Sequence, residues 1–371
     1  MIFIRNQFDF PSLRAVRYAN EKENTPLVSI LIPARNEVDN IEKAIRCSLE
    51  QDYIYTEVIV LDDQSTDGTR EKVQDMAREY DKLRYESGIE KPSDWLGKPW
   101  ACHQLSKKAT GDLFLFVDAD VWFEPTTVSK VVSEMKFADM LTVWPEQKVV
   151  SFWEKMIIPM IYHTLFTLLP AKYVERDPRW MPGKLRSIFS EQFAAACGQF
   201  IAINRKAYEV IGGHRAVKAR IVEDVELAKA AKRNKLKLRM YHGAAQIHCR
   251  MYTSQREIWN GLRKNFFIGF DKNVLLFLFM ALLHIAVFMV PFFTIPYAFI
   301  TGKYFMLWVS VICVLLILMQ RWLLDYKFSW NPVISLLHPV SVFWFQLLGL
   351  RCLTDHFTGM KATWKGREVS E

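Results

Sequence analysis

The chain has 371 residues, of which 51% are hydrophobic and 24% are charged, and its formal net charge is +8 at pH 7. The length allows one large or two ordinary domains, and the apolar content exceeds that of a typical soluble domain. The six cysteines form no C-x-x-C pair and no metal-site spacing, which excludes a cysteine-based zinc site and fits reduced thiols in the cytosol.

Residues 1–25 form an N-terminal segment ahead of the first predicted strand. Its opening, MIFIRNQFDF, contains no apolar stretch long enough for a signal peptide. We therefore expect the domain that follows to remain in the cytoplasm.

Short apolar runs in the first third of the chain predict buried strands. They are LVSILIP (27–33), EVIVLDD (57–63), Leu83–Glu86 and DLFLFVDAD (112–120). Helical spacing of apolar residues follows the first two runs, and Asn36 is the expected cap of the first helix. This alternation of strands and helices predicts a doubly wound α/β sheet with helices on both faces.

Acidic pairs stand at two strand ends, Asp62-Asp63 and Asp118-Ala119-Asp120, and a third pair, Glu223-Asp224, opens a helical run. Carboxylates at strand ends converge on the crevice where open α/β sheets bind ligands. The D-x-D pair suits Mg²⁺ or Mn²⁺ on a diphosphate, Asp62-Asp63 suit a ribose or base, and a carboxylate at 223–224 can serve as a general base. Each pair alone also fits a plainer interpretation: a solvated turn, a helix cap or compensation of a helix dipole.

The middle of the chain is less regular. The apolar and aromatic segment 151–170 is interrupted by Pro159 and predicts either an interfacial helix lying on a bilayer or a core helix of the head. Residues 172–187, KYVERDPRWMPGKLRS, predict a mobile polar loop.

Three blocks without Lys, Arg, Asp or Glu follow residue 273: 274–300, 304–319 and 333–350. A span needs about 20 apolar residues, so the first block is long enough and the other two are marginal to adequate. Pro339 interrupts the last block. We expect a membrane region at 271–353 with two to four spans or re-entrant helices.

Basic residues cluster between Lys229 and Lys272, just before the first apolar block, and the tail at 354–371, interpreted as a basic tail, carries Lys361, Lys365 and Arg367. Positive charge beside a span marks its cytoplasmic side and attracts anionic lipids. A nucleic-acid patch is the disfavoured alternative. A cytoplasmic tail conflicts with three full spans, so one block is expected to be re-entrant or interfacial, either the Pro339 segment or one end of the first block.

Together, these motifs resemble membrane-bound glycosyltransferases of family 2, which have the GT-A fold, a Rossmann-like mixed sheet that binds nucleotide-diphosphate sugars. The resemblance runs from PARNE (33–37) through DDQSTDGT, DAD and ED to a Gln/Arg/Trp cluster, over roughly residues 26 to 270. Three stretches look closest to enzymes that glycosylate isoprenoid lipids, of the carotenoid (staphyloxanthin-type) and hopanoid-associated kinds: WLGKPWACHQ (95–104), GQFIAINRKAYEVIGGH (198–214) and VEDVELAK (222–229).

The resemblance implies a GT-A catalytic domain at 26–270 with C-terminal transmembrane helices. It implies that Asp224 is the catalytic base of an inverting displacement and that Glu223 orients it. Asp120 would hold the divalent metal, Mg²⁺ or Mn²⁺. The implied nucleotide-sugar contacts are Pro33, Arg35, Glu37, Asp62, Asp63, Lys98 and Asp118.

One departure from the family pattern concerns Gln-x-x-Arg-Trp. Here the residues are Gln255, Arg256 and Trp259, with the Arg shifted by two positions, which puts processive polymer synthesis in doubt. These three residues and His214 are candidates for acceptor or diphosphate contacts. Their plainer interpretations are juxtamembrane charge and a surface loop.

The expected function is transfer of a sugar, glucose first among the candidates, from a UDP-sugar to an isoprenoid lipid in the membrane. The enzyme would be a multi-pass protein of the cell membrane with its catalytic domain in the cytoplasm and no nucleic-acid partner. The alternatives are a polyprenyl-phosphate sugar synthase and a non-catalytic nucleotide-binding membrane protein. Intramembrane transport paths require ionisable groups, and the apolar blocks contain only His284 and His338, which disfavours a transporter.

Overall fold

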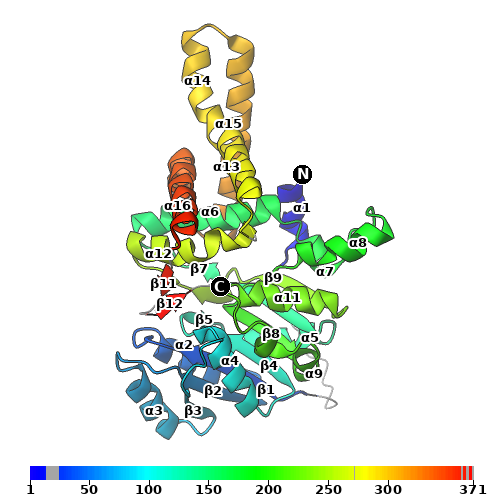
Figure 1. The fold of residues 1–371 in the computed structure, drawn as a ribbon, viewed down its shortest axis with the longest axis vertical. Helices are drawn as coiled ribbons and strands as arrows, with labels where there is room; N and C mark the ends of the chain where they lie inside the picture. Colours follow the sequence, from blue (N-terminus) through cyan, green and yellow to red (C-terminus); the bar gives the residue numbers. More distant parts are fainter. Residues whose placement is uncertain (14–24, 271, 361, 365–366, 370–371) are drawn as a thin grey trace. The chain divides into compact units, whose positions relative to one another are not determined.

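The fold was analysed in a computed structural model that describes residues 1–371 except 14–24, 271, 361, 365–366 and 370–371 (Figure 1). Parts of the expected N-terminal segment and of the basic tail therefore lie outside the described residues. The chain divides into two compact units. The first comprises residues 1–148 and 169–251, and the second comprises 149–168 and 252–370.

A seven-stranded mixed sheet forms the centre of the first unit. Its strand order is β3-β2-β1-β4-β8-β6-β9. The strands are β1 (Val28–Ala34), β2 (Thr56–Asp62), β3 (Leu83–Ser87), β4 (Leu113–Val117), β6 (Met140–Trp144), β8 (Phe200–Asn204) and β9 (Leu238–His242). β1 pairs in parallel with β2 and β4, whereas β8 runs antiparallel to both of its neighbours, β4 and β6. The four predicted strands are confirmed, and the sheet is mixed.

Helices cover both faces of this sheet. The helices that pack against its strands are α2 (Ile41–Leu49), α3 (Thr69–Glu79), α4 (Gly97–Lys108), α5 (Thr127–Met135), α7 (Lys172–Glu175), α9 (Arg205–Val210) and α11 (Glu223–Arg233). The unit also contains α1 (Ile2–Asp9), α8 (Gly183–Phe189), α10 (Gly213–Ala216) and a 3-10 turn η1 at Ser190–Phe193. A small sheet of β5 (Val121–Phe123), β7 (Glu146–Gln147) and β10 (Ile247–Cys249) completes the unit.

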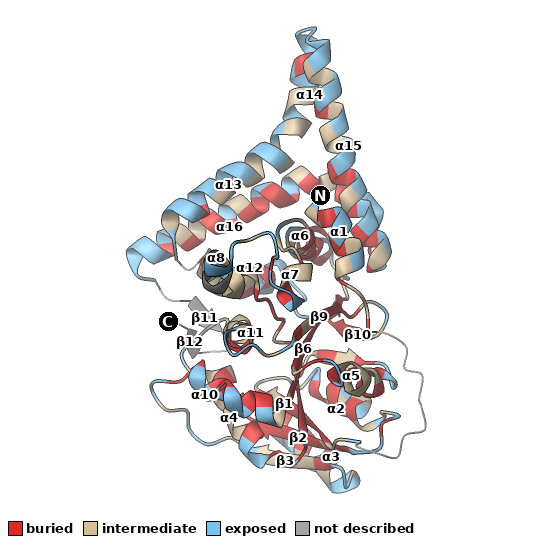
Figure 2. Cartoon of the chain, turned by 90° about the vertical axis from the view of Figure 1, so that its right-hand side faces the viewer, coloured by how far each residue is buried: buried red, intermediate tan, exposed pale blue. Residues whose placement is uncertain are grey.

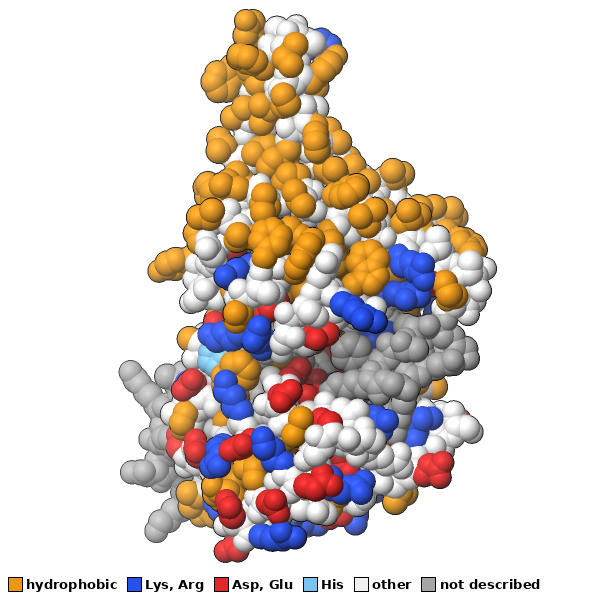
Figure 3. All heavy atoms as spheres, turned by 90° about the vertical axis from the view of Figure 1, so that its left-hand side faces the viewer, with side chains coloured by type: hydrophobic (Ala, Val, Ile, Leu, Met, Phe, Trp, Pro, Cys, Tyr) orange, Lys and Arg blue, Asp and Glu red, His pale blue; other side chains and the backbone are white. Residues whose placement is uncertain are grey.

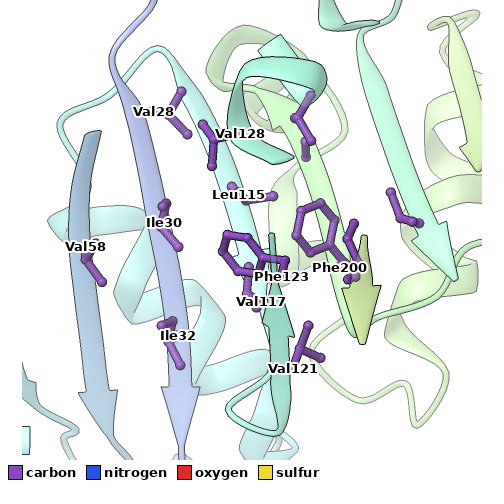
Figure 4. Close-up of a cluster of buried hydrophobic side chains, with 14 of the residues drawn as sticks. Val28, Ile30, Ile32, Val58, Leu115, Val117, Val121, Phe123, Val128 and Phe200 are labelled. Carbon is purple, nitrogen blue, oxygen red and sulfur yellow. The ribbon is translucent and has the colours of Figure 1, made fainter. Parts of the chain in front are cut away.

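Burial explains the sheet, because alternate residues of a strand point to opposite faces. Ile30, Ile32 and Val58 pack on one face with residues of α2, α3 and α5, as Figure 4 shows for the centre of this cluster. On the other face, Phe114 and Phe116 contact Tyr208 of α9. The strands β1 and β2 are buried throughout almost their whole length (Figure 2).

Two sequence expectations for the first unit are wrong. Asn36 does not cap the first helix, which begins at Ile41; it has φ +52°, and its side chain accepts a hydrogen bond from Thr66 N at 2.9 Å instead. The segment 172–187 is not a plain loop, because it contains α7 and the start of α8.

The second unit is helical. Its elements are α6 (Phe152–Leu168), α12 (Gln255–Phe266), η2 (Ile268–Phe270), α13 (Val274–Phe288), α14 (Val290–Ile300), α15 (Tyr304–Lys327), η3 (Pro332–Leu337) and α16 (His338–Thr358), with the strand pair β11 (Ala362–Trp364) and β12 (Arg367–Val369). The core-helix interpretation of segment 151–170 placed it in the head, and this is wrong. Met156, Ile157 and Met160 of α6 belong to the core of the second unit, with Phe345 and Leu348 of α16.

Among the residues that the structure describes, two helical segments are long and apolar enough to cross a membrane, Tyr304–Lys327 and Pro332–Thr358. The pair Gln255–Phe270 and Val274–Phe288, bent by 112°, would make a third if it counts as one span. Hydrophobic side chains cover the outside of α13, α14 and α15 in Figure 3, and they include Leu275, Leu282, Phe293, Phe305 and Trp308.

The first apolar block is not one continuous span, as its length suggested. The helix breaks at Met289 (φ −122°, ψ −49°), where α13 ends and α14 begins. The cause is Pro291, which has no N–H to donate and whose ring conflicts with the carbonyl four residues earlier. Pro339, by contrast, does not interrupt a helix, because it lies in the first turn of α16, where proline is tolerated.

Candidate active site at the carboxyl edge of the large sheet

The edge where β1, β2 and β4 end is also the edge where β8 begins. Because β4 and β8 are antiparallel, Val117 pairs with Phe200. The next residue, Asp118, donates its N–H to Gln199 O at 3.1 Å. The antiparallel strand thus brings the 197–199 segment beside the D-x-D motif, although the two are far apart in sequence.

Lys98 links two carboxylate side chains and one backbone carbonyl at this edge. It lies in the first turn of α4, and its Nζ is 2.6 Å and 2.8 Å from the two carboxylate oxygens of Asp118. The same ammonium lies 3.5 Å from Glu223 Oε1 and 3.2 Å from the carbonyl oxygen of Gly198. Its positive charge is therefore directed at the acidic residues of the site.

Asp224 is held by two backbone N–H groups. Gly198 N donates to Oδ2 at 2.7 Å, and Val225 N donates to Oδ1 at 2.8 Å. A Cβ on Gly198 would lie only 3.2 Å from Asp224 Oδ2 and 3.2 Å from Lys98 Nζ. A side chain here would crowd both groups, whereas glycine lets the backbone approach the carboxylate directly.

Burial governs the ionisation of the acidic pair. Desolvation raises the pKa of Glu223 to about 7, with the charge of Asp224 adding to the effect and Lys98 opposing it. Desolvation also raises the pKa of Asp224. For Lys98, burial alone would lower the pKa, but Asp118 and Glu223 outweigh it and raise the pKa well above its usual value. Carboxyl groups whose pKa is raised by burial are typical of proton-transferring sites.

A small cavity of about 10 Å³ lies among these groups. Of the residues singled out from the sequence, Pro33, Lys98, Asp118, His214, Glu223 and Asp224 line it. Residues far apart in the chain are therefore brought to one place by the sheet edge and by the first turns of α4, α10 and α11.

Asp62, Asp63, Arg35 and Glu37 do not line this cavity but lie in the two adjoining strand-end loops. Buried Asp62 accepts from Arg70 Nε and from Ser65 N, each at 3.1 Å. Arg35 Nη1 donates to the carbonyl oxygen of Asp63 at 2.5 Å. Glu37 N donates to Thr69 Oγ1 at 2.8 Å. These bonds join the loop after β1 to the loop after β2.

Asp120 lies between β4 and β5, across the small sheet from Cys249, which pairs with Val121. In the described part of the chain, no three His, Cys, Asp or Glu side chains gather in metal-binding geometry. Mg²⁺ and Mn²⁺ do not need such a group, since they bind through one or two carboxylates plus waters and substrate phosphates. The hard oxygen donors of Asp118 and Asp120 fit that coordination.

Gln255, Arg256 and Trp259 lie in the second unit, at the start of α12. Gln255 and Arg256 are exposed. The Trp259 ring packs edge-on against Trp344, with centroids 5.2 Å apart, so it contributes to the packing of that unit.

Sequence reasoning missed Gly198, Cys102 and Phe116, which also line the cavity. The signal for Gly198 was present: a glycine directly ahead of an apolar strand favours close backbone approach. Cys102 and Phe116 gave no such signal, because buried apolar residues of a helix and a strand are common.

Comparison with known proteins agrees with this geometry. Residues 29–212 match glycosyl transferase family 2. The chain carries a family 2 glycosyltransferase domain. The 4,4'-diaponeurosporenoate glycosyltransferase of Staphylococcus haemolyticus is 25% identical over 236 residues, covering 62% of this chain and 58% of that protein. Its counterpart from Staphylococcus aureus (strain USA300) is 27% identical over 233 residues, covering 62% and 57%. The matches thus span less than two thirds of those relatives.

Among solved structures, a mannosyltransferase from Pyrobaculum calidifontis, in complex with GDP-Man and Mn²⁺, is similar over 97% of this chain and 94% of its own, with 17% identity and a TM-score of 0.52. At that identity the likeness concerns the fold alone. It agrees with a GT-A-like mixed sheet followed by apolar C-terminal helices.

Proposed function

We propose that this chain is an inverting, metal-dependent glycosyltransferase that moves a sugar from a UDP-sugar to an isoprenoid lipid in the membrane. The observation that carries the proposal is the Lys98–Asp118–Glu223–Asp224 cluster at the carboxyl edge of the sheet, in which Glu223 is buried and the other three residues are partly buried. This edge is where open α/β sheets bind their ligands. The family 2 match contains Lys98 and Asp118 and ends at residue 212, before Glu223 and Asp224.

Asp224 is the proposed general base. Its carboxylate is fixed by Gly198 N and Val225 N, and burial raises its pKa toward the range in which a carboxylate takes a proton efficiently. Removing the proton from an acceptor hydroxyl lets that oxygen attack the anomeric carbon from the face opposite the diphosphate, which inverts the configuration. Glu223 and Lys98 keep the base in position.

A divalent cation held by Asp118 and Asp120 would supply Lewis-acid stabilisation of the diphosphate leaving group. Asp62 and Asp63, in the neighbouring loop after β2, are the proposed contacts for the uridine. Arg35 supports that loop by donating to Asp63 O, and Pro33 and Glu37 stand on the adjoining strand end and loop.

A membrane acceptor is supported by the two helices that can cross a bilayer. It is also supported by the relatives, which are named for a carotenoid acceptor, 4,4'-diaponeurosporenoate. We propose a multi-pass protein of the cell membrane with a cytoplasmic catalytic domain at 26–270, a membrane region at 271–353 and a cytoplasmic tail at 354–371. Arg256 and Gln255 of α12 are candidate contacts for the acceptor or the diphosphate.

The test is incubation of the detergent-solubilised full chain with labelled nucleotide sugars, a host lipid extract and Mn²⁺, followed by mass spectrometry of the lipids. The donor panel should include GDP-mannose as well as UDP-glucose. The proposal expects a new glycolipid with a UDP-sugar donor, and Asp224→Asn should abolish it. Asp75→Asn is the matched control, because the Asp75 side chain is 70% exposed and pairs with Arg78 on the surface of α3.

The chemistry of the product distinguishes the acceptors. A product whose sugar is released in mild acid would be a sugar phosphate and would favour a polyprenyl-phosphate sugar synthase. An acceptor carboxylate is already ionised, so Asp224→Asn would then retain part of the activity. Binding of a nucleotide sugar without any transfer or hydrolysis would refute catalysis.

A further inference from the structure

The orientation of the His214 ring is fixed by Tyr208. His214 N donates to the phenol oxygen at 3.0 Å, and the same hydroxyl lies 2.8 Å from His214 Nδ1. A phenol carries one proton. The phenol oxygen also has two lone pairs, and Ser106 is a second side-chain hydrogen-bonding neighbour of this hydroxyl. When the hydroxyl accepts the backbone N–H and donates its own proton to Nδ1, the proton of the neutral imidazole is on Nε2.

The turn before His214 is shaped for this contact. Gly212 and Gly213 both have positive φ, +77° and +52°. A Cβ at Gly213 would collide with the Tyr208 ring. Glycine at this position therefore allows the backbone to pass close over the phenol and presents the His214 N–H to it.

His214 is neutral at physiological pH. The residue is only 4% exposed, and its ring packs edge-on against Phe116 at 4.8 Å between centroids. Burial, with the charge of Lys98 adding to it, lowers the pKa of His214 to about 3. Within the described residues its hydrogen bonds are those to Tyr208, and the ring lines the active-site cavity. In that tautomer Nε2, which does not contact Tyr208, is a neutral donor on a ring that lines the cavity.

The other walls of the cavity indicate what this donor meets. Asp118, Glu223 and Asp224 contribute three carboxyl groups, and Lys98 is already held by two of them. Where no cation intervenes, a phosphate oxygen would be repelled by that set. A hydroxyl suits it, because it can donate to a carboxylate and accept from an N–H at once. The cavity volume of about 10 Å³ matches a group the size of one water molecule.

We propose that His214, locked as the Nε2–H tautomer by Tyr208, is a specificity residue that donates a hydrogen bond to one hydroxyl oxygen of the transferred sugar. The proton of that hydroxyl is accepted by Glu223 or Asp118. The inference rests on the proposed function, because it assumes that one hydroxyl group of the donor's sugar enters the cavity.

The first experiment measures the tautomer without any turnover. The full chain is labelled with ¹⁵N-histidine, and the His214 signals are identified by their loss in His214→Gln. A neutral Nε2–H ring is expected from about pH 5.5 to 8, and Tyr208→Phe should weaken this preference. A ring that is charged or protonated on Nδ1 near pH 7 would overturn the proposal, whatever the enzyme transfers.

The second experiment measures binding of the donor and of its monodeoxy analogues by calorimetry. Wild type should lose about tenfold in affinity on removal of one particular hydroxyl. His214→Ala should bind the parent donor about tenfold more weakly and show no further loss with that analogue. His214→Gln, whose amide N–H stands near the Nε2 position, should retain more affinity than His214→Asn.

His103→Gln is the matched control, since His103 stacks on Trp100 and does not line the cavity. Equal discrimination against every analogue by wild type and His214→Ala would refute the role of His214. Donor binding with this coupling but no transfer to any lipid would instead refute the proposed function and leave the role of His214 standing.

Discussion

Gly198 packs closely against Asp224 and Lys98, and the substitution Gly198→Ala tests whether this close packing positions Asp224. The added Cβ would lie 3.2 Å from Asp224 Oδ2, 3.2 Å from Lys98 Nζ and 3.3 Å from Asp224 Cβ. Ordinary carbon contacts begin near 3.5 Å, so the neighbours must retreat by about 0.3 Å. The lysine can move cheaply because its chain is flexible. Asp224 cannot, because its oxygens are bonded to Gly198 N and Val225 N.

The cost to folding should be small and the cost to catalysis larger. Overpacking typically destabilises a protein by about 1–3 kcal/mol. Because the neighbours of the added Cβ need to move by only a few tenths of an ångström, we expect a loss of about 1 kcal/mol in folding stability. Misplacing a catalytic group by about 1 Å can cost about a hundredfold in rate. A shift of about 0.3 Å in Asp224 should therefore lower kcat by about three- to tenfold.

Initial rates of transfer at saturating donor, measured beside thermal unfolding of the same detergent-solubilised protein, separate the two effects. Gly183→Ala is the matched control, because nothing lies within 4 Å of the Cβ it would add, at the first residue of α8. It should match wild type in rate. A Gly198→Ala variant that turns over within twofold of wild type would refute the claim that this backbone contact positions the base.

Three further perturbations test other parts of the structure. Burial raises the pKa of Glu223 from 4.5 to about 7 in the folded chain, whereas the glutamine of Glu223→Gln cannot ionise. Wild type should therefore lose folding stability relative to the variant as the pH rises between those two values. Melting temperatures of the two proteins that change in parallel over this pH range would contradict the expectation. The same substitution removes a like charge beside Asp224, so the acidic limb of the kcat/KM profile should move to lower pH; an unmoved limb in the pH–rate profile would count against the coupling. Chelation by EDTA should abolish transfer and Mn²⁺ should restore it, with Asp120→Asn requiring more Mn²⁺; full activity in EDTA would remove the metal from the mechanism. In the second unit, a Cβ on Gly261 would collide with the Tyr252 ring, so Gly261→Ala should destabilise by about 1–3 kcal/mol in thermal melts, whereas Gly269→Ala, which meets nothing within 4 Å, should not.

The strands of the head were predictable because their signal is local. LVSILIP and DLFLFV are continuous apolar runs, as expected for strands buried on both faces, and they became β1 and β4 with their ends shifted by about a residue. The direction of β8 was not predictable in this way. FIAIN is equally apolar whichever way it runs, and its antiparallel pairing depends on the long excursion through 151–199 that precedes it.

The helix break at Met289 shows a different limit. Length and hydropathy describe 274–300 as one block, but the backbone requirement of Pro291 decides where the helix ends. The role of Asn36 depends on tertiary contacts: its side chain bonds to Thr66 in the neighbouring loop, a partner that no local pattern reveals.

The acidic motifs were visible in the sequence, but the pairing of Lys98 with their carboxylates was not. Lys98 was expected to contact a diphosphate, and in the structure its ammonium binds Asp118 and approaches Glu223. This arrangement has an electrostatic consequence. Three carboxyl groups in a buried site cannot all remain charged with one ammonium as compensation, so burial raises the pKa of Glu223 and Asp224 while Lys98 limits the rise. The pair can then hold one proton between them near neutral pH, as neighbouring carboxyls do. A base that shares a proton with its neighbour is available to an acceptor hydroxyl when that proton lies on Glu223. On this reasoning Lys98 tunes the base by its charge, and the affinity of the donor for the enzyme depends on it less than on the metal-binding carboxylates.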